Sequence, residues 1–246
     1  MEGDYLSVMP LVYRKNWLGR YELYQPDLMR AMGIYSVKAL SALRIQSFLE
    51  AIPAQYRKID ITVNQLNRPP RDGSFKVIEK ENQILSLHEG HEHIASQYSD
   101  DFKAKLEKAE EVNLLPIGSV KPERLADFFK KNNRKSIRND QQFHGLQRIM
   151  YNVLHRGTGF ATAFAHPETE ELLAANFYIF SHSRMISLIP VVSPQGKELG
   201  AMEMLKDYMI RSNSKRPLLL DFNTDQLNPY ATAMGAQVEK FYQIKR

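Results

Sequence analysis

The sequence predicts an α/β protein with mixed sheets, and three observations support that class. Apolar residues recur at helical spacing in some segments, and in others they alternate with polar residues or form short β-branched runs. In the second half these segments follow one another as two helices, three strands, and then helix, strand, helix and strand. The 246 residues are 43% hydrophobic and 25% charged, which is typical of packed domains and suffices for one large or two small ones.

The first half is expected to hold a hairpin, one long helix and several short strands. Residues 16–19 read as a turn between two strand-like segments, and Pro53 weakens the last turn of the helix. The helix is followed by a β-branched strand, and the residues after a proline-rich turn are expected to form two short strands. The expected elements span residues 5–13, 21–25, 37–56, 59–63 and 75–88.

Three helices are expected between residues 99 and 156, and the last two of them open the order of segments given above. Ser99 is a candidate N-cap, Pro122 suits the first turn of the next helix, and Gly157 ends the third. Three consecutive strands follow, and then helix, strand, short helix and strand. The helices are expected at 99–111, 119–131, 140–156, 199–212 and 228–234, and the strands at 160–165, 172–181, 184–192, 218–222 and 237–244.

A weak internal repeat suggests a duplication. A helix, two basic residues, a short strand and a polar turn containing Gln-Leu-Asn occur within residues 37–69 and again within residues 199–229. The alternative is that any such helix–strand unit ends in a polar turn. We divide the chain into residues 1–98 and 99–246, and expect the two halves to pack together because no Ser/Gly linker separates them.

Charge and cysteine content limit the function classes. A formal charge of +5 permits an anionic partner such as a phosphorylated cofactor or RNA, although an ordinary solvated surface is the commoner case. The absence of cysteine excludes disulfides, thiolate metal sites and cysteine nucleophiles. No apolar run is long enough to span a bilayer and no signal peptide is evident, so we expect a cytoplasmic protein without a transmembrane segment.

The junction at residues 189–201 is the first candidate site. A strand runs into a polar loop with two glycines, and the loop opens a helix whose free backbone N–H groups suit a phosphate. Lys197 adds a positive charge. The alternative is an ordinary turn capped by Ser193. The candidate phosphate-binding residues are Ser193, Gln195, Gly196, Lys197, Gly200 and Ala201.

From about Pro122 to the end, the order of elements resembles that of the GNAT acyltransferases. Over nearly its full length the chain is similar to the FemABX group, in which two GNAT-like halves are fused. The resemblance implies two such halves packed together, the first truncated at its N-terminus. The segments that carry it are Met9-Pro10-Leu11, Gln25-Pro26, the basic helix from Tyr98 to Ala109, Asp221-Phe222-Asn223, Asn228-Pro229-Tyr230 and Met234-Gly235-Ala236.

The resemblance implies an N-acyltransferase. The donor would be acetyl-CoA, another acyl-CoA or an aminoacyl-tRNA, and the acceptor a small-molecule amine or a peptidoglycan-precursor-like amine. Transfer would be direct, through a tetrahedral intermediate whose oxyanion binds a backbone N–H. Since Pro190 has no N–H, the donor group would be that of Val191 or Val192. The candidate catalytic residues are Glu203, Asp221 and Tyr230.

Two departures from the GNAT pattern support an alternative from another class. Met202 stands where a small residue is usual, and the family's tyrosine position falls on Ala231, one residue after Tyr230. A catalytically silent module would keep the fold and use the groove between its lobes to bind a peptide, a glycan precursor or RNA.

A third hypothesis concerns the segment His88–His93. It holds three imidazoles and two carboxylates, which are ligands for zinc or nickel, but their spacing does not bring all three imidazoles to one helix face. A polar surface loop is the default interpretation, so no metal is expected.

Overall fold

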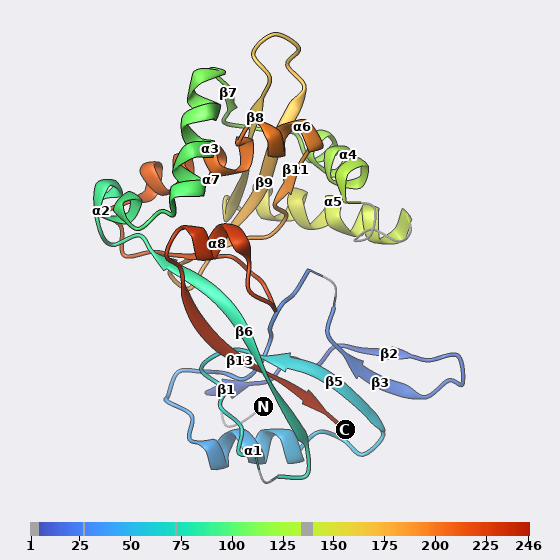
Figure 1. The fold of residues 1–246 in the computed structure, drawn as a ribbon. Helices are drawn as coiled ribbons and strands as arrows, with labels where there is room; N and C mark the ends of the chain where they lie inside the picture. The colour runs from blue at the N-terminus through green and yellow to red at the C-terminus, as the bar shows by residue number, and fades with distance from the viewer. Residues whose placement is uncertain (1–4, 27, 72, 134–139) are drawn as a thin grey trace. The chain divides into compact units, whose positions relative to one another are not determined.

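The computed structural model describes residues 5–26, 28–71, 73–133 and 140–246, and its architecture is mixed α/β (Figure 1). The predicted fold class is therefore confirmed. The chain forms two compact units. Unit 1 takes the residues up to Asn82 together with Thr224–Leu227 and Val238–Arg246, and unit 2 takes Gln83–Asn223 and Asn228–Gln237. The predicted division between residues 98 and 99 stays a prediction.

In its described residues, unit 1 has one helix, part of the large sheet and a separate two-stranded sheet of β1 and β4. The strand order is β2-β3-β5-β13-β6, with β3 and β5 parallel and β2–β3 and β5–β13 antiparallel. Its core is aliphatic, with Ile45 and Leu49 of the helix packed against Ile59 and Ile61 of the sheet. The elements are β1 Ser7–Val8, β2 Tyr13–Lys15, β3 Tyr21–Tyr24, β4 Tyr35–Ser36, α1 Ala42–Glu50, β5 Lys58–Val63, β6 Lys76–Ser86 and β13 Gln237–Lys245.

Unit 2 continues from the last part of β6 in the order β6-β12-β10-β9-β8-β7, and β11 pairs with β9. Only β10 and β12 are parallel among these pairs. Helix α3 packs along α7, and α4 packs along α5. The elements are α2 His91–Ser96, α3 Asp100–Glu111, β7 Leu115–Ile117, α4 Pro122–Asn132, α5 Asp140–His155, β8 Gly159–Ala165, β9 Leu172–Ser181, β10 Arg184–Ser187, β11 Val191–Val192, α6 Pro194–Glu198, α7 Ala201–Asn213, β12 Leu219–Asp221 and α8 Pro229–Ala233.

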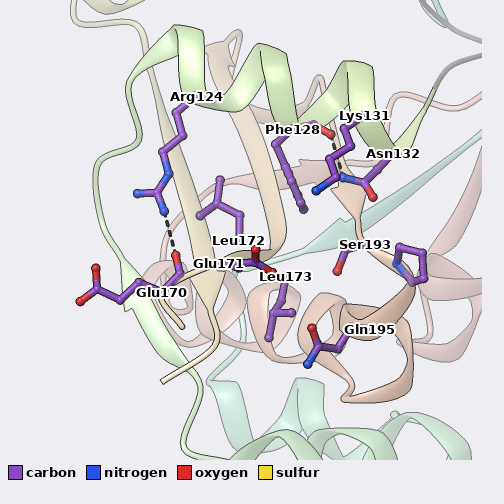
Figure 2. A pocket seen from close by; sticks show the side chains of 11 residues that line it. Arg124, Phe128, Lys131, Asn132, Glu170, Glu171, Leu172, Leu173, Ser193 and Gln195 are labelled. Atoms are coloured by element: carbon purple, nitrogen blue, oxygen red, sulfur yellow. Dashed lines mark hydrogen bonds between the residues drawn. The ribbon is translucent and has the colours of Figure 1, made fainter. Parts of the chain in front are cut away.

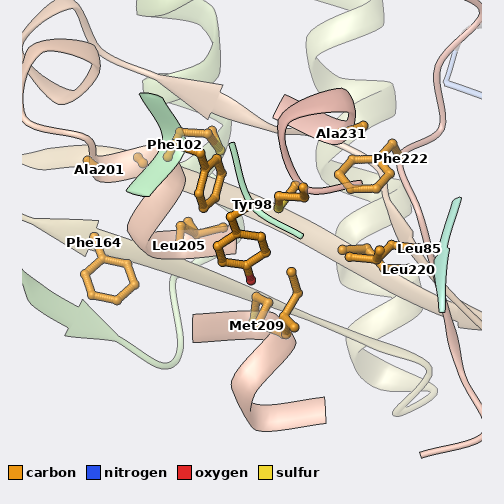
Figure 3. Packing of buried hydrophobic residues seen from close by; sticks show 14 of the residues in the cluster. Leu85, Tyr98, Phe102, Phe164, Ala201, Leu205, Met209, Leu220, Phe222 and Ala231 are labelled. Atoms are coloured by element: carbon orange, nitrogen blue, oxygen red, sulfur yellow. The ribbon is translucent and has the colours of Figure 1, made fainter. Parts of the chain in front are cut away.

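One hydrophobic cluster holds helices α2, α3, α7 and α8 of unit 2 against its sheet (Figure 3). Tyr98 and Phe102 meet with ring centroids 4.7 Å apart, and Leu205 of α7 and Leu220 of β12 belong to the same cluster. Each of these side chains is at least 95% removed from solvent, and their burial stabilises the packing of α3 and α7 on the sheet.

Several predicted boundaries are wrong, and local contacts explain why. The Ser41 side chain accepts a hydrogen bond from the Arg44 N–H, so α1 begins at Ala42 rather than at residue 37. The first predicted strand is two pieces: β1 pairs with β4, and the hairpin is made by β2 and β3. Residues 76–86 form one long strand instead of two, because β13 and β12 both pair with it. The short elements β4, α2, β7 and α6 were not predicted.

Candidate functional site

The predicted strand 184–192 is broken by a β-bulge. Ser187 pairs with Tyr178 and Val191 pairs with Ala175, so four residue steps on one strand oppose three on β9. Pro190 lies within the break, where its missing N–H costs no ladder bond. Beyond the bulge β11 pairs with β9 alone among the described strands, whereas β10 also pairs with β12.

The register of β11 decides which backbone N–H is available. The Ser193 N–H donates to the Leu173 carbonyl at 2.8 Å, so this pair is a hydrogen-bonded pair of the antiparallel ladder. Such pairs alternate, which makes Val192–Ala174 a non-hydrogen-bonded pair and Val191 a bonded one. The N–H of Val192 therefore points away from β9, toward the side where β11 has no described strand neighbour.

Ser193 and Gly196 form a capped turn against the sheet. The Ser193 Oγ accepts the Gly196 N–H at 2.9 Å, which caps the short helix α6 as the alternative sequence interpretation expects. A Cβ on Gly196 would collide with the Leu173 carbonyl oxygen. Packing of α6 on β9 therefore accounts for this glycine without any ligand.

Gly200 is also required by packing. Its φ of +71° lies in the left-handed region, and a Cβ there would collide with the Lys105 carbonyl oxygen of α3. Ala201 and Met202, which open α7, are buried. Because α3 covers this helix start, the glycine does not create an open cradle at that point. Assignment of the loop to a cofactor phosphate stays a prediction.

A pocket of about 520 Å³ adjoins the other end of the loop (Figure 2). Ser193 and Gln195 of the predicted set line it, together with Phe128 and Lys131 of α4. The Arg124 guanidinium donates to the Glu170 carbonyl oxygen at 2.9 Å, which ties α4 to the turn between β8 and β9. The pocket thus combines an aromatic side chain, two cationic side chains, two glutamates and amide or hydroxyl groups within unit 2.

Glu203 and Tyr230, two of the predicted catalytic residues, lie in one electrostatic cluster. The Glu203 side chain is 3% exposed, and its Oε1 lies 3.7 Å from the Lys105 Nζ, which also contacts Asp101 Oδ2 at 3.0 Å. Its Oε2 is buried without a hydrogen-bond partner. Burial raises the pKa of Glu203. Burial, and then the charge of Glu203, raise the pKa of the Tyr230 phenol.

Asp221, the third predicted catalytic residue, is engaged elsewhere. Its Oδ2 lies 3.0 Å from Nη1 of Arg184, and its Oδ1 accepts the Asn223 N–H at 2.8 Å. The carboxylate is 1% exposed and ends β12 beside β10. These contacts give Asp221 a structural role at the end of the parallel strand pair. Glu203, in contrast, has one carboxylate oxygen without a hydrogen-bond partner.

Sequence reasoning missed a buried amine on α7. Lys206 is 2% exposed, and its Nζ donates to Ser187 Oγ at 3.0 Å. Its Nζ also lies 5.5 Å from the ring centroids of Tyr178 and Phe222. Burial lowers the pKa of Lys206 to about 7. The sequence signal that could have identified it is spacing: Lys206 follows Met202 by four residues, which places it on the apolar face of the predicted helix.

The His88–His93 segment contributes one histidine to a polar network. His91 Nε2 lies 2.6 Å from Asp207 Oδ1, the Tyr98 hydroxyl donates to the same oxygen at 3.1 Å, and Arg211 Nη2 donates to Oδ2 at 3.2 Å. Within the described ranges, no three His, Asp or Glu side chains are grouped so as to hold a metal ion. In that same part of the chain, no helix has the length and apolar character needed to cross a membrane.

Comparisons identify the fold. No protein-family model and no curated protein sequence matches the chain. The crystal structure of FemX superposes with a TM-score of 0.66 at 11% identity, over 98% of this chain and 85% of that one. L-PGS from Bacillus licheniformis gives 0.58 at 12% identity, over 96% and 80%. A conserved protein of unknown function from Staphylococcus epidermidis gives 0.52 at 10% identity, over 93% and 84%.

The fold is that of the GNAT-like proteins. More particularly, it is the FemABX-like form of that fold, as the resemblance in the sequence predicts. Identities of 10 to 12% establish the fold and leave the chemistry to be argued from the residues of this chain.

Proposed function

We propose that this chain is an N-acyltransferase that moves an acyl or aminoacyl group directly onto an amine. The single observation that carries the proposal is Glu203, a buried carboxylate whose raised pKa and unpartnered Oε2 suit it to accept a proton. The FemX-like fold supports the same reaction class, since FemX and L-PGS share this architecture.

The reaction requires a proton acceptor, an oxyanion donor and a proton for the leaving group. The acceptor nitrogen attacks the carbonyl carbon, and Glu203 takes the proton that the nitrogen loses. The Val192 N–H, directed away from β9, donates to the oxyanion of the tetrahedral intermediate. When the intermediate collapses, the C–S or C–O bond of the donor breaks and Tyr230 protonates the leaving group. The raised pKa of Tyr230 keeps its phenol protonated for that role.

The proposed donor is acetyl-CoA, another acyl-CoA or an aminoacyl-tRNA. Because α3 covers Gly200, we place the polar part of the donor at the pocket lined by Lys131, Ser193 and Gln195. Phe128 offers an apolar wall there, and Lys131 offers a charge for phosphate. The proposed acceptor is a small-molecule amine or a peptidoglycan-precursor-like amine. Both donor classes are cytoplasmic, and we place the protein in the cytoplasm.

Thermal unfolding tests the donor. The protein is heated with coenzyme A, acetyl-CoA, a long-chain acyl-CoA and charged tRNA in turn, each at about a hundredfold over its dissociation constant, where one-site binding adds about 2.7 kcal/mol. A donor that binds in the pocket raises the Tm, and Lys131→Glu abolishes the rise. Lys121→Glu, an exposed change at the start of the same helix, should leave the rise intact.

A catalytically silent binding module is the second candidate. Covered Gly200 and buried Met202 favour it, because both remove the open phosphate cradle of the GNAT pattern. This candidate predicts that a peptide, glycan precursor or RNA raises the Tm while no acyl transfer is detected with any donor. Transfer that is lost in Glu203→Gln would exclude it.

A further inference from the structure

The hairpin of β2 and β3 ends in a rigid tip. Asn16 Oδ1 accepts the N–H groups of Leu18 at 2.9 Å and Arg20 at 3.0 Å, and the Asn16 side-chain amide donates to Glu22 at 2.9 Å. The Gly19 N–H bonds the Asn16 carbonyl, with Gly19 at a φ of +71°. Three side-chain hydrogen bonds from one asparagine therefore fix the conformation of this turn.

This rigid tip presents apolar side chains to water. Trp17, the single tryptophan of the chain, is 91% exposed, and the adjacent Leu18 is 52% exposed. Exposure of two large apolar side chains side by side has an unfavourable hydration cost. Because the hydrogen bonds of the turn hold both side chains outward, a partner that removes them from water would recover this cost.

Cations follow immediately behind the tip. Arg14 and Lys15 on β2 and Arg20 before β3 are exposed, and Glu22 is the acidic side chain that faces them, 3.6 Å from Arg14 Nε. The local charge of the hairpin is thus positive. The partner that fits this surface has an apolar layer that receives the tip, and negative charge at the level of the cations behind the tip.

Three tyrosines at the base of the hairpin contact one another, and Tyr13 among them is 55% exposed. Tyr13, Tyr21 and Tyr56 pack against one another at centroid distances of 5.6 to 6.2 Å, mostly edge to face. Lys15 Nζ lies 5.0 Å from the Tyr21 ring centroid. Single-stranded nucleic acid binding uses a succession of free aromatic faces, whereas at the tip the Trp17 ring is followed by the aliphatic Leu18, which favours a different anionic partner.

We propose that the β2–β3 hairpin is an anchor for the surface of an anionic lipid bilayer. Trp17 and Leu18 enter the boundary between headgroups and acyl chains, and Arg14, Lys15 and Arg20 contact the lipid phosphates. The order of the groups, apolar at the tip and cationic one step behind, matches the order of layers in a bilayer surface. Attachment of this kind is peripheral and reversible.

Tryptophan fluorescence tests the proposal, because Trp17 is the single emitter of its kind. The full chain is titrated with vesicles of phosphatidylcholine alone and with vesicles containing one third phosphatidylglycerol. We expect a blue shift of the emission with the anionic vesicles, weaker binding at high salt and little change with the neutral ones. Arg20→Gln should weaken binding about fivefold, and Leu18→Ser about tenfold.

The matched control is Leu43→Ser, since Leu43 on α1 is 76% exposed in the same unit but lies outside the hairpin. It should bind vesicles as the unchanged chain does. Failure of the anionic vesicles to shift the emission overturns the proposal, and so does equal loss in Leu43→Ser and Leu18→Ser. A shift produced by single-stranded RNA and not by vesicles would assign the hairpin to nucleic acid instead.

Discussion

Gly200 faces the main-chain carbonyl of Lys105 so closely that no Cβ fits between helix α7 and helix α3. In the sequence this glycine suggests a phosphate loop, and in the structure it is a helix–helix contact. A Gly200→Glu change would disturb the contact itself, so loss of ligand binding in that variant would not locate a ligand. Lys131→Glu, which alters a pocket-lining side chain, avoids this ambiguity.

The first prediction separates two costs of placing a side chain at Gly200: the collision with the Lys105 carbonyl and the left-handed backbone conformation. Gly200→Ala should lower the free energy of unfolding by at least about 3 kcal/mol, because left-handed φ costs roughly 1–2 kcal/mol and the carbonyl must also move. Gly157→Ala is the control, since Gly157 has a φ of +65° and open space around it. Denaturant unfolding measures both. Equal losses would contradict the helix–helix explanation.

The second prediction concerns Glu203. Glu203→Gln should lower acyl transfer by about a hundredfold or more and remove the acid limb of the pH–rate profile. Burial raises the pKa of the carboxyl in the fold, so the native protein loses stability as the pH rises from 4.5 through the folded value. The neutral amide has no such loss, and the variant should melt higher than the unchanged chain at pH 7. A lower Tm would show that the charged form is stabilising.

The third prediction distinguishes Asp221 from Glu203. Asp221→Asn breaks the buried ion pair with Arg184 and should cost about 3–5 kcal/mol of unfolding free energy. Any loss of transfer should then follow the loss of folded protein, as judged by activity per folded molecule. Full stability combined with lost transfer would return Asp221 to the catalytic group.

The fourth prediction is a pH dependence from Lys206. Its folded pKa of about 7 lies below the ordinary 10.5, so the unfolded chain binds one more proton between those values. Stability should rise with pH over that window and stay level below about pH 7. Lys206→Met should remove the slope and raise the unfolding free energy at neutral pH by a few kcal/mol.

Thermal or urea unfolding from pH 6 to pH 10 checks this dependence. Lys197→Met, a change of an exposed lysine, should leave the slope unchanged. A slope that persists in Lys206→Met would assign it to other groups.

Elements with their own start and stop signals were predictable from sequence. The Ser99 side chain caps α3 by accepting the Phe102 N–H at 3.3 Å, and Pro122 opens α4, both as predicted. Short elements without such signals were not found. Strand β7 has three residues and exists because it pairs with β8, a contact between segments more than forty residues apart.

The candidate site was predictable in composition and not in geometry. Glu203, Asp221 and Tyr230 were all plausible proton acceptors by residue type. In the structure Asp221 forms an ion pair with Arg184. Glu203 interacts electrostatically with Tyr230 and keeps one carboxylate oxygen without a hydrogen-bond partner. Partner choice of this kind depends on residues distant in sequence, so no local pattern encodes it.

The sequence by itself determined the α/β class, the order of the second-half elements and the resemblance to the FemABX group, because periodicity, caps and element order are local properties of the chain. The tertiary structure alone decided that Gly196 and Gly200 serve packing, that Val192 rather than Val191 directs its N–H away from β9, and that Lys206 is buried. Each of these depends on which backbone or side chain comes to lie opposite, and that is fixed only when the helices and strands pack.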